Sequence, residues 1–177
     1  PLLPVFVWFY ILAFPFWAVG YLLAARRGKD MFYRFVATDL TYILFALSAF
    51  FNTDHQYKTG DPRKYPFGKI LALVYSLDGG NSPSNLFPSI HCYVSWMCWK
   101  GVEGSEKVPK WYQRFSLVFA ILIIISTQVL KQHYIVDAAA ALLLVEFFWR
   151  FYQKGQRHKW VVHVLHIKRS NMDIKKQ

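Results

Sequence analysis

Residues 1–25, with the sequence PLLPVFVWFYILAFPFWAVGYLLAA, contain no charged side chain. A helix of about 20 apolar residues crosses the roughly 30 Å hydrocarbon core of a bilayer, so this stretch is long enough to span a membrane. Pro15 is tolerated inside such a helix when neighbouring helices satisfy the freed backbone carbonyl. The stretch therefore predicts a membrane-spanning helix near the start of the sequence.

Four further apolar runs follow, at residues 35–51, 86–99, 115–130 and 134–149. Of the 177 residues, 55% are hydrophobic, 19% are aromatic and only 18% are charged, whereas soluble domains carry about 25% charged residues. The expected fold is an all-α integral membrane bundle with five spans visible. Within the polar stretch 52–85, residues 67–77 predict a short helix that lies on the membrane surface.

The formal net charge of +11 is unevenly distributed. Residues 26–34 hold four basic side chains against one acid, residues 100–114 hold four against two, and residues 150–177 hold eight against one. Basic clusters that flank apolar runs are typical of cytoplasmic loops facing anionic lipid, and nucleic-acid binding is not expected from this pattern. Residues 1–152 are expected to form the membrane domain and residues 153–177 a basic cytoplasmic tail.

The same charge pattern predicts a topology. With the three basic segments inside, five alternating spans place Pro1, the loop 52–85 and the link near Lys131 on the extracytoplasmic side. An outward Pro1 also predicts one more span before it, making about six in the full-length protein.

The segment 85–91, NLFPSIH, leads into the third run. Proline is favoured at the first position of a helix, so Pro88 is expected to start one, with Asn85 or a neighbour as its cap. The N–H groups of Ser89, Ile90 and His91 would then lie at the positive end of the helix dipole, where anions bind. The alternative is an ordinary cap beside a buried histidine.

A second constellation combines Ser126 with residues 131–137, KQHYIVD. His133 and Asp137 are four residues apart, so a helix would place them on one face within hydrogen-bond reach. A carboxylate that holds one imidazole nitrogen leaves the other free to attack or to accept a proton. Lys131 suits either a phosphate or a membrane anchor. The alternative is a structural His–Asp pair that seals a helical bundle.

Pro88-Ser89-Ile90-His91, together with Ser126, His133 and Asp137, resembles the motifs of the type 2 phosphatidic acid phosphatase superfamily. The resemblance covers about residues 58–149. It implies a bundle of about six membrane helices and an active site that needs no metal or other cofactor. It also implies that His133 forms a phosphohistidine, that Asp137 orients it, and that His91 protonates the leaving oxygen. Ser89, Ser126 and the neighbouring N–H groups, such as that of Ile90, would bind the phosphate.

The sequence departs from that family at two places. Thr127 stands where the family has an arginine, and Lys131 is the candidate to supply the missing charge. The family's Arg-Pro pair is also absent. The basic loop 57–64 offers Lys58, Arg63 and Lys64 as phosphate-binding candidates, each of which is about as compatible with simple exposure to solvent.

These residues predict a metal-independent phosphatase acting on a lipid phosphate or a polyprenyl diphosphate at the extracytoplasmic face of the plasma membrane. Two alternatives stay open. One is a headgroup phosphotransferase of the sphingolipid-synthase type, which would use the same histidines. The other is a membrane protein that binds lipid phosphate without catalysis, and the missing Arg-Pro pair is its best support.

Overall fold

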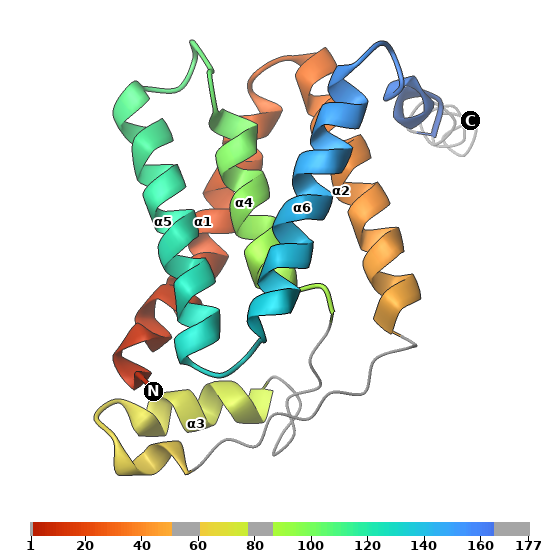
Figure 1. The fold of residues 1–177 in the computed structure, drawn as a ribbon. Coiled ribbons are helices and arrows are strands. Elements are labelled where there is room, and N and C mark those ends of the chain that lie inside the picture. Colours follow the sequence, from red (N-terminus) through yellow and green to blue (C-terminus); the bar gives the residue numbers. More distant parts are fainter. Residues whose placement is uncertain (1, 51–60, 78–86, 165–177) are drawn as a thin grey trace, which may run out of the picture.

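The computed structural model describes residues 2–50, 61–77 and 87–164, and this part of the chain is helical without strands. Five helices form a bundle: α1 (Val7–Ala25), α2 (Lys29–Phe50), α4 (Ile90–Val102), α5 (Lys110–Val129) and α6 (Ile135–Gln153) (Figure 1). The short α3 (Gly68–Leu77) lies across one end of the bundle, and 3-10 turns occupy Pro4–Phe6 and Pro62–Lys64. A further helix begins at Lys159. The all-α prediction is confirmed.

Each of the five predicted apolar runs forms the body of one helix in the bundle. Among the described residues, two helices are long and apolar enough to cross a membrane, Pro4–Ala25 and Lys110–Val129. α2 and α6 carry acidic side chains within their apolar stretches, at Asp39 and Glu146. α4 has 13 residues and is therefore only about 20 Å long. The predicted short helix of the loop is present as α3.

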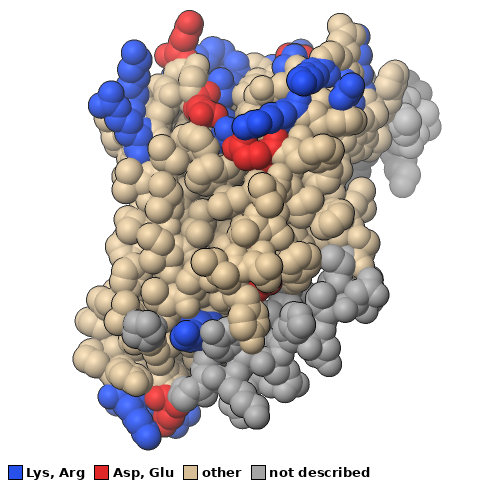
Figure 2. Space-filling model, in the orientation of Figure 1, with Lys and Arg blue, Asp and Glu red and all other residues tan. Residues whose placement is uncertain are grey.

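The helices of the bundle alternate in direction, and this brings the basic segments together at one end. Arg27 Nη1 donates to the carbonyl of Gly101 at 3.1 Å, which joins the α1–α2 turn to the end of α4. Arg34 Nη1 donates to the carbonyl of Gln153 at 3.2 Å, which joins α2 to the end of α6. Lys and Arg side chains gather at this end in Figure 2. We call it the basic end.

The first part of the predicted tail packs against the bundle. His158 Nε2 lies 2.8 Å from Asp30 Oδ1, and Val161 is buried with Ala37 and Tyr152. Residues 158–161 therefore contact α2 at the basic end. The boundary predicted at residue 153 coincides with the end of α6.

α4 is the central helix, with α1, α2, α5 and α6 around it. Small residues allow α1 to approach it closely. A Cβ added to Gly20 would lie 2.5 Å from Cys98 Sγ, and one added to Gly101 would lie 2.9 Å from the Cβ of Ala24. Close backbone approach through small residues is a common packing mode between membrane helices.

Two acidic side chains in the apolar runs join neighbouring helices by hydrogen bonds. Asp39 of α2 accepts hydrogen bonds from Tyr21 of α1, at 2.8 Å, and from Tyr93 of α4. Glu146 of α6 accepts from Trp96 of α4 at 3.0 Å and pairs with a lysine, Lys100 of α4, at 2.9 Å. Both acids are half-buried, and acidic groups removed from water in this way are tolerated when they are paired. Both acids therefore contribute to the cohesion of the bundle.

Candidate functional site

The two predicted motifs meet at the end of the bundle opposite the basic end. The N–H of Ser89 donates to the carbonyl of Asp137 at 3.3 Å, so the starts of α4 and α6 lie against each other. The ring centroids of His91 and His133 are 6.3 Å apart, with their planes inclined by 51°. Each histidine is only 8% exposed. Residues more than 40 positions apart in the sequence thus form one buried histidine pair.

His91 lies in the first turn of α4 against an aromatic wall that belongs to α1. Its ring stacks on Tyr10 with centroids 4.2 Å apart, and the Trp17 and Phe14 rings lie 5.1 Å and 6.1 Å away. Its Nε2 is buried without a hydrogen-bond partner among the described residues. The aromatic wall fixes the plane of the His91 ring. Its Nε2 could bond to a group other than the described residues.

Ser89 caps α4, and this corrects the predicted start of the helix. Its hydroxyl accepts from the N–H of Cys92 at 3.4 Å, and its backbone is extended, with φ −60° and ψ 116°. The helix therefore begins at Ile90, and Pro88 precedes the cap instead of occupying the first helical position. A serine hydroxyl satisfies a first-turn N–H that proline cannot, which explains the shift. Asn85, the other capping candidate, lies outside the described residues.

The cap changes which N–H groups remain at the start of α4. The N–H of Ser89 is already bonded to the carbonyl of Asp137. Contrary to the prediction from the sequence, it is therefore not available to an anion. The N–H groups of Ile90 and His91 remain in the first turn, where a helix has no internal partner for them. The Ile90 side chain is 44% exposed.

α5 ends in a turn that fixes the backbone of Lys131. The N–H of Lys131 donates to the carbonyl of Gln128 at 3.1 Å, and that of Gln132 to the carbonyl of Thr127 at 3.0 Å. These two bonds define a Schellman motif, whose left-handed position is usually glycine. Lys131 occupies that position with φ 58°. A left-handed conformation costs a residue with a Cβ about 1 to 2 kcal/mol, so a lysine here is an outlier of the kind found at functional sites.

His133 follows this turn and precedes α6. The prediction that His133 and Asp137 share a helix is wrong, because the turn after α5 continues to Tyr134 and α6 begins at Ile135. Asp137 Oδ2 instead accepts the N–H of Tyr134 at 2.8 Å, as part of a capping box. It lies 3.7 Å from His133 Nδ1, which is longer than a hydrogen bond. Asp137 therefore acts on the imidazole mainly through its charge.

The two hydroxyl residues near the end of α5 are engaged within their own helix. Ser126 is buried, and its Oγ donates to the carbonyl of Ile123 at 2.6 Å. Thr127 Oγ1 donates to the carbonyl of Ile124 at 2.8 Å and lies 3.6 Å from Cys92 Sγ. Thr127, at the position of the expected arginine, thus serves as a buried contact between α4 and α5.

Of the three candidates in the predicted basic loop, the structure describes Arg63 and Lys64. Arg63 and Lys64 are exposed in the 3-10 turn before α3. No hydrogen bond or ion pair joins either of them to His91 or His133 within the described ranges. Lys58 lies outside the described residues.

Sequence reasoning missed the role of α3 and of the aromatic wall. Leu71, Val74 and Tyr75 of α3 are buried with Val7 and Tyr10 of α1, so α3 covers the end of the bundle that holds the site. The Tyr75 hydroxyl donates to the carbonyl of Leu130. Burial raises the pKa of Tyr75 to about 12, so the phenol keeps its proton at neutral pH. The helical spacing of 71, 74 and 75 was the available signal for α3.

Comparison with protein-family models, with curated proteins and with solved structures finds no match to this chain. Among the described residues, no three His, Cys, Asp or Glu side chains are grouped so that they could hold a metal ion. The site therefore has to be interpreted from its own geometry.

Proposed function

We propose that this chain is an integral membrane phosphatase that removes a phosphoryl group from a lipid phosphate or a polyprenyl diphosphate. The observation that carries the proposal is the buried pair of His91 and His133, with Asp137 beside the second ring. Each histidine has one buried nitrogen without a hydrogen-bond partner among the described residues. His91 Nε2 is available to a bound phosphate, whereas the orphaned nitrogen of His133 is Nδ1, which faces Asp137.

The surface of the bundle supports a membrane location. Figure 2 shows charged side chains gathered toward the two ends of the molecule, with a band of uncharged side chains between them. Large apolar side chains are exposed on several helices, including Leu44 at 65%, Val118 at 56% and Phe14 at 55%. Extensive exposed apolar surface is unfavourable in water and favourable against lipid. The two long apolar helices agree with this location.

The charge asymmetry supports the orientation. The described parts of the three basic segments, residues 26–34, 100–114 and 150–164, lie at one end of the bundle and would face the cytoplasm. The histidine pair lies at the opposite end, which would be the extracytoplasmic face, with the plasma membrane as the expected compartment. A lipid phosphate of the outer leaflet would then present its headgroup at the depth of the pair.

The chemistry follows from the arrangement of the rings. His133 Nδ1 faces Asp137, so Nε2 is the nitrogen that attacks phosphorus. The P–N bond forms as the bond from phosphorus to the lipid oxygen breaks, and His91 supplies the proton that this oxygen takes up. Water then attacks the phosphohistidine and releases inorganic phosphate, with His91 accepting a proton from the water. One phosphate that contacts each ring at about 3 Å can bridge the 6.3 Å between the ring centroids of His91 and His133.

The nucleophile is tested with purified protein in detergent and dioctanoyl phosphatidate as substrate. Changing His133 to Ala (His133→Ala) is expected to lower phosphate release on the order of ten-thousandfold, as removal of a catalytic nucleophile does. The matched control is His163→Ala, because His163 is exposed and outside the bundle. Release by the His133 variant at the control's rate would refute the assignment.

The acid is tested by changing the leaving group. A lipid alkoxide needs a proton to leave, whereas the monophosphate that leaves a polyprenyl diphosphate needs it less. His91→Ala is therefore expected to slow phosphatidate cleavage at least tenfold more than farnesyl diphosphate cleavage. Equal slowing of both substrates would contradict the acid role.

Transfer in place of hydrolysis is a second candidate function, and the site has one feature in its favour. Both histidines are nearly closed to solvent, which limits the access of water to a phosphohistidine. Mass spectrometry of the products distinguishes the two reactions. Inorganic phosphate released from phosphatidate supports hydrolysis, whereas a new phosphodiester formed when phosphatidylcholine and ceramide are supplied together supports headgroup transfer.

A further inference from the structure

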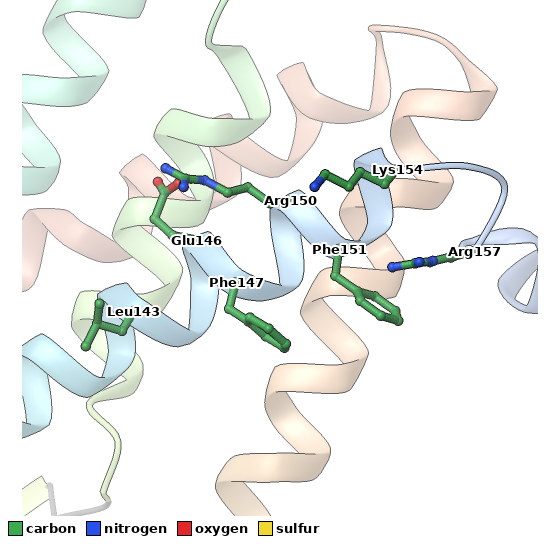
Figure 3. A pocket seen from close by; sticks show the side chains of 7 residues that line it. All are labelled: Leu143, Glu146, Phe147, Arg150, Phe151, Lys154 and Arg157. Atoms are coloured by element: carbon green, nitrogen blue, oxygen red, sulfur yellow. The ribbon is translucent and has the colours of Figure 1, made fainter.

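A second hollow lies on α6, at the basic end of the bundle and away from the histidine pair. It has a volume of about 420 Å³ and is formed by one face of α6 and the turn that follows (Figure 3). Three of its side chains are cations, Arg150, Lys154 and Arg157. The function proposed above uses none of them.

The positive charge of this hollow is only partly neutralised. Glu146 is the one acid lining it among the described residues. That carboxylate lies 3.4 Å from Arg150 but also 2.9 Å from Lys100, so its charge is shared with a lysine outside the hollow. Lys154 and Arg157 are exposed. The guanidinium of Arg157 lies 4.3 Å above the ring of Phe151, which holds it over the hollow.

Along α6 toward its start, the side chains that line the hollow are mostly apolar. Leu143, Phe147 and Phe151 are spaced four residues apart, so they lie on one face of α6. They are 72%, 62% and 39% exposed, and Figure 3 shows the two phenylalanine rings on the same side of the helix. From Leu143 to Lys154 the helix rises about 16 Å. An apolar strip thus leads from the uncharged band of the bundle to a cationic rim.

We infer that this hollow binds one anionic phospholipid of the cytoplasmic leaflet. The headgroup phosphate lies between Lys154 and Arg157, with the Arg150–Glu146 ion pair farther along the hollow, and an acyl chain lies along Leu143 and Phe147. The charge of the rim selects an anionic headgroup, and the apolar strip selects a lipid over a soluble anion, which would gain nothing from it. The inference rests on the membrane location of the proposed function but not on its phosphatase chemistry.

The test measures lipid retention by native mass spectrometry of the detergent-purified chain. Dioleoyl phosphatidylglycerol is compared with dioleoyl phosphatidylcholine, which has the same chains and no net charge. Each basic residue near an anionic lipid strengthens binding about fivefold, so the two cations that Glu146 does not pair, Lys154 and Arg157, give a preference on the order of twenty-five-fold. The variant Arg150→Gln/Lys154→Gln/Arg157→Gln is expected to lose most of that preference.

The matched control is Arg26→Gln/Lys110→Gln/Arg114→Gln, which removes the same charge from exposed sites at the basic end but outside the hollow. It is expected to keep the preference for phosphatidylglycerol. Circular dichroism and gel filtration establish that both variants are folded. Equal retention of the two lipids by the unmodified chain, or equal loss in both variants, would overturn the inference. Displacement of the lipid by millimolar inorganic phosphate would also overturn it, because the site would then bind a simple anion.

This binding assay does not measure phosphate release. Loss of the phosphatidylglycerol preference with retained phosphatase activity contradicts this inference alone. If the His133 variant loses phosphatase activity but keeps its preference for phosphatidylglycerol, the result bears on the histidine site and leaves the lipid-binding inference intact.

Discussion

The substitution Asp137→Asn separates two roles of the Asp137 carboxylate. One is to cap the start of α6, and the other is to place a negative charge beside His133. Asp137 is 1% exposed, accepts the N–H of Tyr134 at 2.8 Å and lies 3.7 Å from His133 Nδ1. Asparagine has the same shape and keeps an oxygen for the cap. It removes the negative charge that stabilises the imidazole ring when phosphorylation makes that ring positive.

The size of the effect follows from the distance. Two unit charges 3.7 Å apart interact by about 4.5 kcal/mol at an effective dielectric constant of about 20. Each 1.36 kcal/mol in the barrier changes the rate about tenfold, so the upper limit of the loss in kcat is on the order of a thousandfold. The free energy of unfolding is expected to change little, because the side-chain oxygen of asparagine can still accept the N–H of Tyr134 in the capping box.

Asp137→Ala serves as the comparison. It loses the charge and the cap together, so we expect the same loss of kcat and, in addition, a decrease of about 1 kcal/mol in the free energy of unfolding. Phosphate release from dioctanoyl phosphatidate gives kcat, and thermal unfolding in the same detergent gives the change in stability.

The reasoning is refuted if the asparagine variant keeps kcat within about threefold of the unmodified protein. Asp137 would then be a helix cap only, and the His–Asp pair would be structural. A loss of activity that tracks a loss of stability in both variants would point to the same structural role.

Two further predictions concern the backbone. Lys131→Gly should raise the free energy of unfolding by about 1 kcal/mol, because φ 58° suits glycine, whereas Lys131→Ala should not raise it. If Lys131 binds a lipid phosphate, both substitutions should raise KM for that substrate. An unchanged KM in both variants would exclude this role. Gly20→Ala should destabilise the bundle by about 1 to 3 kcal/mol, because the new Cβ would lie 2.5 Å from Cys98 Sγ. Ala18→Val, at an exposed position of the same helix, is the control, and equal midpoints of thermal unfolding for the two variants would contradict the close approach.

The apolar runs predicted the helices of the bundle, but their charged ends were not predictable from hydropathy. The second run was predicted from residue 35, whereas α2 begins at Lys29. Its first two turns carry Asp30 and Arg34, which form an i,i+4 ion pair at 2.9 Å. Such a pair supports a helix without adding apolar residues. Hydropathy identifies the part of a helix that contacts lipid or core, and that part is shorter than the helix.

The motifs correctly indicated that His91 and His133 approach each other, because one lies in the first turn of α4, the other lies just before α6, and both helices start at the same end of the bundle. They did not indicate Tyr10 or Trp17, which lie in a uniformly apolar run where no residue type stands out. Pairing between α1 and α4 depends on packing at Gly20 and Gly101, and a single sequence does not reveal which small residues face each other. The aromatic wall therefore required the structure.

The length and position of α4 have a consequence for biosynthesis. With 13 residues, α4 is too short to cross a hydrocarbon core of about 30 Å by itself. Two of its neighbours, α5 and α6, are synthesised after it, so Lys100 leaves the ribosome before its partner Glu146. In the proposed membrane location, the insertion of α4 would be completed only after α6 has been synthesised and Glu146 pairs with Lys100.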